Sequence, residues 1–180
     1  MKNLSPFYYL CIAFLAFADY AYAAVPEYDC TTKNDKEYCK GADKKPVTGK
    51  ITKYQDDGNY LSIINYKNGY QDGLATYFGK NGKLKERAYF KQGVKNGMDK
   101  IYYENRTIYQ LLNYRRGLLN GVQVYYTSKG KQLGRFEYKD GVLQSGFCMR
   151  FEGEKFKKYD LTAEEIKQTP QNQLVKCEEP

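Results

Sequence analysis

Short stretches rich in Tyr, Ile and Leu alternate with polar turn residues across residues 47–159. Two interleaved series of turn sequences separate these stretches. Asn-Gly and Asp-Gly are typical of two-residue hairpin turns, because both central residues need a positive φ. The pattern therefore predicts a meander of short antiparallel strands with one hairpin per unit. The first series is Asp57-Gly58, Asn81-Gly82 and Lys129-Gly130, and the second is Asn68-Gly69, Gln92-Gly93, Arg116-Gly117 and Asp140-Gly141.

Glycines and aromatic residues recur with a period of 24 residues. The marker glycines are Gly49, Gly73, Gly97 and Gly121, and Gly146 follows after 25 residues. Five residues after each marker stand Tyr54, Phe78, Tyr102 and Tyr126, and seventeen after it stand Tyr66, Phe90, Tyr114 and Tyr138. A second glycine stands nine residues after the marker, except in the third unit, where Arg106 replaces it. We expect a looser turn at Asn105-Arg106, because positive φ is costly for arginine, and a bulge or longer turn near Leu143 to Ser145.

Two-residue turns would place each marker glycine directly across from the aromatic residue seventeen positions later. Gly49 would face Tyr66, Gly73 would face Phe90, Gly97 would face Tyr114 and Gly121 would face Tyr138. A ring can lie over a residue that has no side chain and cover its backbone. The same face would carry an apolar row of Ile64, Ala88, Leu112 and Phe136. The opposite face would carry Tyr54, Phe78, Tyr102 and Tyr126, with Lys85, Arg87, Lys100 and Arg135 between them.

Both faces mix apolar and polar side chains, and the sequence offers no amphipathic helix to cover either of them. We therefore expect an all-β fold, a single-layer twisted antiparallel meander of β-hairpin repeats over residues 47–159. Such a sheet has two open edges, which invite pairing with other chains. We expect residues 24–46 to cap the first edge and residues 160–180 to cap the second. There, Thr162-Ala163-Glu164-Glu165 is a capping box and predicts a short helix over Ala163 to Gln168 that ends before Pro170.

The repeat resembles the MORN repeat, specifically its bacterial variant. The resemblance rests on G-x-x-x-x-[YF]-x-x-x-G followed by the second aromatic residue and glycine, as in residues 74–97 (LATYFGKNGKLKERAYFKQGVKNG) and 98–121 (MDKIYYENRTIYQLLNYRRGLLNG). It covers roughly residues 47 to 146, with a truncated further unit up to Tyr159. It implies an interaction scaffold whose repeats have no catalytic residues. Eukaryotic relatives are associated with lipid and protein binding, and bacterial variants are often described as antitoxin or immunity proteins.

Residues 1–23 are typical of a cleavable secretory signal peptide. Lys2 precedes an apolar run from Pro6 to Ala18, and Ala21-Tyr22-Ala23 offers a cleavage site of the small-x-small type. The run is short for a membrane span, which needs about 20 residues; an uncleaved N-terminal anchor is the alternative. We expect an exported protein, either periplasmic or secreted.

Export changes the interpretation of the cysteines, because disulfides persist in oxidising compartments. With Cys11 inside the apolar run, four cysteines remain, and four allow three disulfide connectivities. We favour the pairs that are close in sequence, Cys30 with Cys39 and Cys148 with Cys177, since each would hold one terminal segment. The alternative is a four-thiolate zinc site, but no C-x-x-C pair supplies the usual ligand spacing.

Composition argues against enzymatic activity. None of the 180 residues is His, which excludes His-based triads, acid–base pairs and zinc ligands. Adjacent carboxylates at Asp56-Asp57 would point apart in a turn, and the capping box engages Glu165, whereas glycosidases need two carboxylates across a cleft. We expect no enzyme, cofactor or metal; a hydrolase would need a concave pocket with converging polar groups.

The formal net charge of +8 and the aromatic content of 16% point to binding. Export and the even distribution of Lys and Arg argue against nucleic acid as the ligand. The charge either keeps the surface soluble or attracts an acidic partner. We expect a non-enzymatic protein-binding module, of the immunity or antitoxin type, that acts by occluding its partner; the alternative is an envelope-associated protein that binds anionic lipid or glycan. The expected contact residues, chosen because interfaces favour Tyr and Arg, are Tyr54, Phe78, Tyr102, Tyr126, Arg87 and Arg135.

Overall fold

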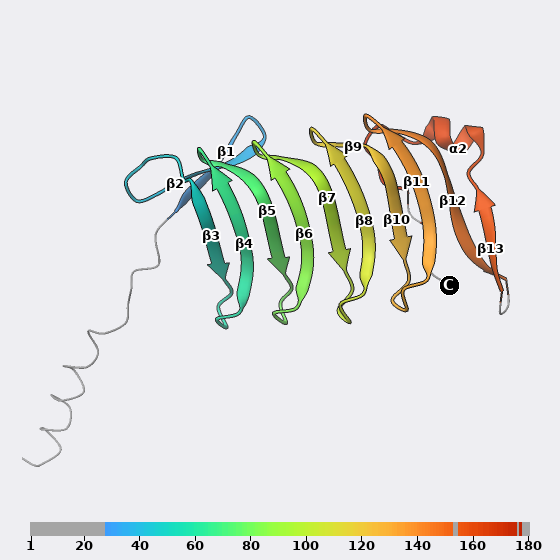
Figure 1. Ribbon diagram of the computed structural model, residues 1–180, viewed down its shortest axis with the longest axis horizontal. Coiled ribbons are helices and arrows are strands. Elements are labelled where there is room, and N and C mark those ends of the chain that lie inside the picture. The colour runs from blue at the N-terminus through green and yellow to red at the C-terminus, as the bar shows by residue number, and fades with distance from the viewer. Residues whose placement is uncertain (1–27, 153–154, 176, 178–180) are drawn as a thin grey trace, which may run out of the picture.

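The computed structural model describes residues 28–152, 155–175 and 177. Within these residues, 13 strands form one open antiparallel sheet followed by one short helix, which confirms the predicted all-β meander. Figure 1 shows the hairpins following one another along the sheet, with strands β1 and β2 at one end and helix α2 at the other. The elements are β1 (Asp29–Lys33), β2 (Lys36–Lys40), β3 (Gly49–Tyr54), β4 (Tyr60–Lys67), β5 (Tyr70–Phe78), β6 (Leu84–Lys91), β7 (Val94–Tyr102), β8 (Ile108–Arg115), β9 (Leu118–Leu119), β10 (Gly121–Tyr126), β11 (Gln132–Lys139), β12 (Val142–Glu152), β13 (Lys155–Asp160) and α2 (Ala163–Gln168).

The signal peptide predicted for residues 1–23 lies outside the described residues. Among the residues that the structure does describe, no helix combines the length and the apolar character that a membrane span requires.

The two ends of the strands carry different turns. At one end the predicted two-residue turns are confirmed: Lys67 pairs with Tyr70, and both Asn68 and Gly69 have positive φ (52° and 84°). At the other end the prediction of two-residue turns is wrong. The Gln55 amide donates to the Asn59 carbonyl at 2.7 Å, and Gly58 has φ of 82°, so three residues form the turn.

The expectation of a looser turn at Asn105-Arg106 is also wrong. Arg106 adopts φ of 69°, and its amide donates to the Tyr103 carbonyl at 2.9 Å, as the glycines do in the other three-residue turns. The Asn105 side chain holds this conformation, because its Oδ1 accepts from the Thr107 amide at 3.1 Å and its Nδ2 donates to the Ser128 carbonyl at 2.8 Å. These local hydrogen bonds offset the backbone strain of a non-glycine residue at positive φ.

The predicted register is confirmed, although its premise about the turns fails at one end. Every marker glycine pairs with the aromatic residue seventeen positions later. A three-residue turn would shift each hairpin by one position, but a one-residue bulge in the returning strand restores the register. The bulged residues are Leu61, Lys85, Tyr109 and Leu133. The bulge expected near Leu143 to Ser145 is confirmed at Gln144, which lies between the partners of Tyr138 and Glu137.

The marker glycines are required for their backbone conformation. Gly73 and Gly97 have φ of 102° and 115°, a region that favours glycine. A Cβ on Gly121 would meet only the Cβ of Asn113, at 3.9 Å, and one on Gly49 would meet nothing within 4 Å. The paired rings therefore do not occupy the space of the missing side chains, and cover of the glycine backbone by these rings stays a prediction.

Hydrogen bonds between turns join successive hairpins into a ladder. In each two-residue turn of the repeats, the glycine amide donates to a backbone carbonyl 22 residues earlier. The Gly69 amide donates to the Val47 carbonyl at 2.8 Å, and the Gly93 amide donates to the Gln71 carbonyl at 2.8 Å. The N-terminal and C-terminal segments of the described residues extend this ladder, because the Cys39 amide donates to the Gly69 carbonyl and the Asn172 amide to the Gly141 carbonyl. The terminal segments thus continue the pattern of the repeat that they cover.

One face of the sheet, here called the capped face, carries the predicted apolar row of Ile64, Ala88, Leu112 and Phe136, and the structure buries all four residues. Cross-strand pairing places two polar residues, Asp99 and Gln123, in the same row. Asp99 is only 1% exposed, and the Lys95 side chain reaches its carboxylate. The row consists of Ile51, Ile64, Ala75, Ala88, Asp99, Leu112, Gln123 and Phe136.

Terminal segments cover the two ends of the capped face, and the favoured disulfides are both confirmed. Cys30–Cys39 joins β1 to β2, and Cys39 packs in a cluster with Ile51, Ile64 and Ala75. Cys148–Cys177 holds the C-terminal tail against a second cluster that contains Phe136. Residues in that second cluster include Leu119, Tyr125, Leu133, Tyr138, Leu143, Leu161, Ile166, Leu174 and Val175.

Helix α2 has the predicted bounds and the predicted capping box. The Thr162 side chain accepts from the Glu165 amide, and the Glu165 carboxylate accepts from the Thr162 amide at 2.8 Å. The hydrogen bonds that the Thr162 amide and hydroxyl donate to the carboxylate lower the pKa of Glu165. The helix begins the segment that leads to Cys177, and so fixes where the tail turns back onto the sheet.

Candidate binding surfaces

The face opposite the capped face, here called the open face, is apolar and basic. Paired residues from β3 to β10 form a continuous row in which the only charged side chains are Arg87 and Lys100. These two residues lie directly opposite each other on β6 and β7, and neither has an ion pair within the described chain. The row consists of Thr52, Ile63, Thr76, Arg87, Lys100, Leu111 and Val124.

Beside this like-charged pair lies a shallow depression of about 260 Å³. Tyr89 and Met98 contribute its apolar part and are 49% and 40% exposed. Large exposed apolar side chains framed by cations mark a surface suited to a partner. We call this group the open-face patch: Leu74, Arg87, Tyr89, Met98 and Lys100.

The contact residues expected from the sequence occupy several separate places, and their role stays a prediction. Tyr54 and Phe78 both lie close to the Tyr60 ring, with centroid distances of 5.3 and 5.7 Å. Tyr102 lines a cavity of about 560 Å³ at the three-residue turns, together with Lys80 and Lys83.

Tyr126 contributes its carbonyl to the hydroxyl of Tyr103, at 2.8 Å. Arg87 belongs to the open-face patch. Arg135 follows Val124 in the open-face row and lines a different depression with Ile166. The structure therefore brings Tyr54 and Phe78 together, but it does not gather all six residues into one patch. The bulges explain this distribution, since each predicted aromatic residue lies beyond a bulge, at the turn end of its strand.

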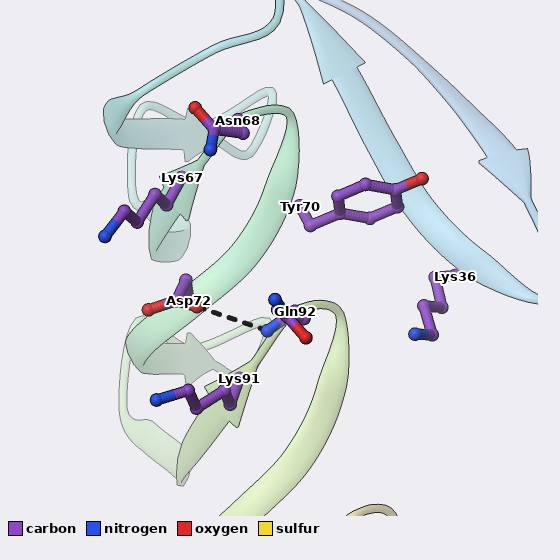
Figure 2. A pocket seen from close by; sticks show the side chains of 7 residues that line it. All are labelled: Lys36, Lys67, Asn68, Tyr70, Asp72, Lys91 and Gln92. Carbon is purple, nitrogen blue, oxygen red and sulfur yellow. Dashed lines mark hydrogen bonds between the residues drawn. The ribbon is translucent and has the colours of Figure 1, made fainter.

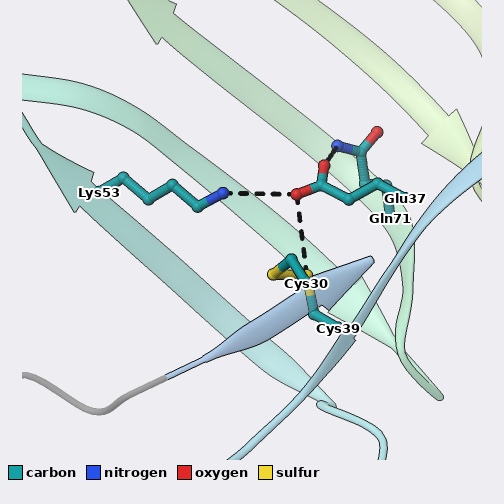
Figure 3. The surroundings of a disulfide bond; sticks show 5 residues. All are labelled: Cys30, Glu37, Cys39, Lys53 and Gln71. Atoms are coloured by element: carbon teal, nitrogen blue, oxygen red, sulfur yellow. Dashed lines mark hydrogen bonds and ion pairs between the residues drawn. A yellow bond between two sulfur atoms is a disulfide. The ribbon is translucent and has the colours of Figure 1, made fainter. Parts of the chain in front are cut away.

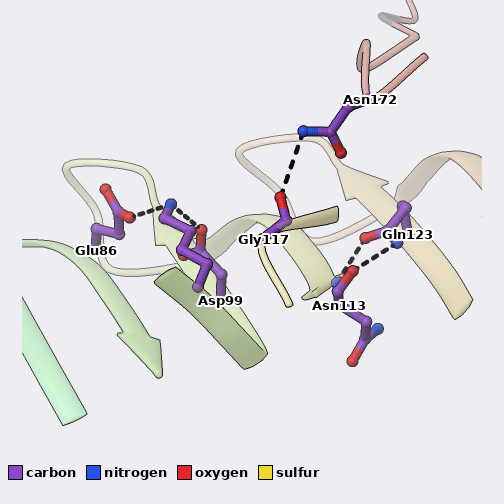
Figure 4. A network of polar contacts seen from close by, with 7 residues as sticks. Glu86, Asp99, Asn113, Gly117, Gln123 and Asn172 are labelled. Atoms are coloured by element: carbon purple, nitrogen blue, oxygen red, sulfur yellow. Dashed lines mark hydrogen bonds and ion pairs between the residues drawn. The ribbon is translucent and has the colours of Figure 1, made fainter. Parts of the chain in front are cut away.

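The capped face, in contrast, pairs its charges. Lys95 lies between two carboxylates, 2.8 Å from Glu86 and 2.5 Å from Asp99, and Figure 4 labels these two acids. Burial alone would lower the pKa of Lys95, but the hydrogen bonds and charges of the two carboxylates outweigh it and raise that pKa. Burial raises the pKa of Asp99. Because its ammonium group is held by two acids, Lys95 serves stability rather than nucleophilic chemistry.

A second polar network on the capped face surrounds the first disulfide. The Glu37 carboxylate accepts from Lys53 at 3.4 Å and from Gln71 at 2.7 Å (Figure 3). Cys30, Glu37 and Cys39 form a group of potential metal ligands by proximity alone. The two sulfur atoms are joined in a disulfide and the carboxylate is engaged, so this group serves to fix β2 on the sheet. The disulfides also exclude the four-thiolate zinc site that was the alternative for the cysteines.

The sequence analysis did not predict the buried polar residues of the capped row, although the repeat pattern contained a signal for them. Asp99 and Gln123 stand two positions after their marker glycines, where the first two units have Ile51 and Ala75. The Gln123 side chain forms two hydrogen bonds with the Asn113 backbone (Figure 4). The Gln123 Oε1 accepts from the Asn113 amide at 2.6 Å, and the Gln123 Nε2 donates to the Asn113 carbonyl at 3.1 Å. A polar residue at an apolar position of a repeat thus indicated a buried hydrogen-bonding network.

No protein family and no curated protein matches the chain. Among solved structures, it is similar to part of the accessory secretory protein 1, 2 and 3 structure from Streptococcus pneumoniae, with 22% identity and a TM-score of 0.34, over 53% of this chain and 18% of that one. It is also similar to part of the GtfA/B complex bound to UDP and GlcNAc, with 11% identity and a TM-score of 0.25, over 74% of this chain and 24% of that one. The chain spans less than a quarter of either matched chain, and at these scores neither similarity bears on its function.

Proposed function

We propose that this chain is an exported, non-enzymatic protein-binding repeat module whose open face binds an acidic surface of its partner. The observation that carries the proposal is the direct cross-strand opposition of Arg87 and Lys100. Like charges directly opposite each other destabilise a sheet, so this pair lowers the stability of the fold that contains it. A partner carboxylate placed between the two cations would relieve the repulsion and gain two charge-assisted hydrogen bonds.

The rest of the open-face patch fits the same role. Tyr, Met and Arg are enriched at protein interfaces, and Tyr89 and Met98 flank the cations as exposed apolar contacts. An acidic partner would also be steered by the net charge of +8. Two disulfides support a location in an oxidising compartment, where such a partner would be met.

Occlusion is the mechanism that the shape favours. An open sheet presents a broad surface without a deep cleft, so it can cover a partner's active site more readily than it can enclose a substrate. Together with the resemblance to bacterial MORN variants, this leads us to propose an immunity-type role, in which the covered partner is a toxin.

Site-specific photo-crosslinking in the full oxidised chain tests the proposal. A photoreactive residue at Tyr89 would capture the partner, which is then purified, and its affinity measured for the Arg87→Glu/Lys100→Glu variant. We expect at least a tenfold loss of affinity, or about 1.4 kcal/mol. The matched control is Lys80→Glu/Lys83→Glu, which changes the charge equally at the three-residue turns and should stay within about twofold of the wild type.

Equal losses for the two variants would show that only net charge matters and would overturn the open-face assignment. Partner binding that survives the patch variant unchanged would overturn it as well. If the patch variant loses affinity but the partner's activity is unaffected by the wild-type chain, protein binding stands and the immunity role fails.

A further inference from the structure

A second surface, independent of the open face, lies where the N-terminal hairpin meets the two-residue turns. A cavity of about 440 Å³ opens there between β2 and the turns that follow β4 and β6. Figure 2 shows Lys67 and Lys91 extending toward the same side from consecutive turns, with Lys36 beyond Tyr70 and Gln92. We call this the turn-edge pocket: Lys36, Lys67, Asn68, Tyr70, Asp72, Lys91 and Gln92.

Close contacts between β2 and the turn glycines fix the walls of this pocket. A Cβ on Gly93 would lie 2.9 Å from the Cβ of Lys36, and one on Gly69 would lie 2.3 Å from the Tyr38 ring. The Tyr70 ring packs edge-on against Tyr38, with 5.0 Å between the centroids. The pocket is therefore built by docking of the disulfide-tied hairpin, and its aromatic wall is held in place before any ligand arrives.

The turn-edge pocket is lined by three lysines and by a single carboxylate, that of Asp72. The Asp72 Oδ2 accepts from the Gln92 backbone amide at 3.2 Å, and against its one negative charge the three lysines leave an excess of two positive charges. Within the described residues, neither Lys36, Lys67 nor Lys91 has an ion pair. Unpaired cations gathered at one cavity produce a positive potential that attracts anions.

A later turn of the same sheet provides an internal comparison. Arg115 occupies the position equivalent to Lys67 and Lys91, and it forms an ion pair at 2.6 Å with Asp140 of the next turn. The residues equivalent to Asp140 beside the two lysines are Gln92 and Arg116, which cannot neutralise them. The fold therefore allows this position to be neutralised from the chain itself, and the first two turns leave it open.

We propose that the turn-edge pocket binds an acidic oligosaccharide. Equivalent turns are two strands apart, so Lys67 and Lys91 are separated by about 10 Å along the sheet, which suits a linear ligand with repeated acidic groups. The side-chain amides of Asn68 and Gln92 can both donate and accept, as a ligand rich in hydroxyl groups requires. The Tyr70 ring supplies a flat apolar wall.

A lipid surface fits this pocket less well. Membrane-surface binding combines cations with apolar side chains that enter the bilayer boundary. None of the exposed large apolar residues of the described chain lines the turn-edge pocket. Those residues are Tyr54, Tyr60, Leu61, Tyr89, Met98 and Val142.

Fluorescence anisotropy with a labelled oligogalacturonate, the full oxidised chain and low ionic strength tests the proposal. The Lys36→Gln/Lys67→Gln/Lys91→Gln variant should bind this probe at least tenfold more weakly than the wild type. A matched control, Lys80→Gln/Lys83→Gln/Lys129→Gln, removes the same charge at the opposite turns and should stay within twofold. Labelled maltodextrin of equal length should not bind, and melting temperatures check that both variants are folded.

Three outcomes would overturn the proposal: equal losses for the two lysine variants, equal binding of maltodextrin, and failure of the wild type to bind oligogalacturonate. Vesicles of phosphatidylglycerol and phosphatidylcholine that bind through the pocket lysines, while oligogalacturonate does not, would reassign the site to lipid. The Arg87→Glu/Lys100→Glu variant should retain oligogalacturonate binding, so the failure of this proposal is distinguishable from that of the protein-binding function.

Discussion

On β6 and β7, charged side chains form ion pairs on one face of the sheet and lie unpaired within the described chain on the other, although the same strands form both faces. On β6 and β7, Glu86 and Asp99 point to the capped face, where Lys95 joins them. The next residue on each strand, Arg87 and Lys100, points to the open face, where the two cations oppose each other. A step of one residue along a strand thus leads from a neutralised network to an unrelieved repulsion.

This contrast separates the parts of the molecule that serve stability from those available for interaction. The capped face buries its central row, engages its charges and is held at both ends by disulfide-tied segments. The open-face row from β3 to β10 contains no acidic residue. Substitutions at neighbouring residues should therefore have different consequences according to the face to which each residue points.

The largest effect should come from the neighbours Leu112 and Leu111 on β8. Leu112 is 1% exposed in the capped row, whereas Leu111 lies in the open-face row. Leu112→Ala should lower the free energy of unfolding by about 2–5 kcal/mol, because it removes buried methyl groups and leaves a cavity. Leu111→Ala should cost about 1 kcal/mol or less, as measured by urea denaturation. Equal losses would show that the open face is as well packed as the capped face. The two faces would then not differ in their contribution to stability.

A smaller difference in stability should distinguish substitution of Lys95 from substitution of Lys100. Lys95→Met leaves Glu86 and the buried Asp99 without their cation, so we expect a loss of roughly 3 kcal/mol. Lys100→Met removes repulsion with Arg87 and should change stability by no more than about 0.5 kcal/mol. Chemical denaturation at neutral pH measures both variants. The double variant Lys95→Met/Asp99→Leu should recover part of the loss, and failure to recover any would contradict the pairing argument.

The repeat pattern predicts the register because several independent signals agree. Glycines and aromatic residues at fixed intervals identify which residues pair, and those pairs are found. The turn length could not be predicted in the same way. Asp57-Gly58 suits a two-residue turn or the last two positions of a three-residue turn, and the compensating bulge falls on residues as different as Leu61 and Lys85. Chemically unrelated residues at one position leave no pattern.

The candidate surfaces are less accessible to sequence analysis, for two physical reasons. Arg87 was found because strand alternation places it on the open face, but Tyr89 and Met98 belong to no repeated signal. The turn-edge pocket depends on the docking of β2 against turns that lie more than 30 residues later. Only the Cys30–Cys39 pair indicated that this hairpin forms. The sequence placed it at the first edge of the sheet, but nothing indicated that β2 would pair with β5.

The smallest effect concerns a buried phenol of the capped face, Tyr125. Its hydroxyl is buried without a hydrogen-bond partner among the described residues, and burial raises its pKa. A raised pKa means that the folded state binds the phenol proton more tightly than the unfolded state does. The contribution of this proton to the free energy of unfolding is therefore complete below about pH 10 and is lost as the pH rises further. Tyr125→Phe should be neutral, or stabilising by less than about 1 kcal/mol, at pH 7, and its stability should fall less steeply above pH 10. Urea denaturation from pH 7 to 11 measures this, with the exposed Tyr54→Phe as the control for loss of a phenol. A clear loss of stability at pH 7 would reveal a hydrogen bond to the Tyr125 hydroxyl, whereas an unchanged alkaline slope would show that the phenol is accessible to water.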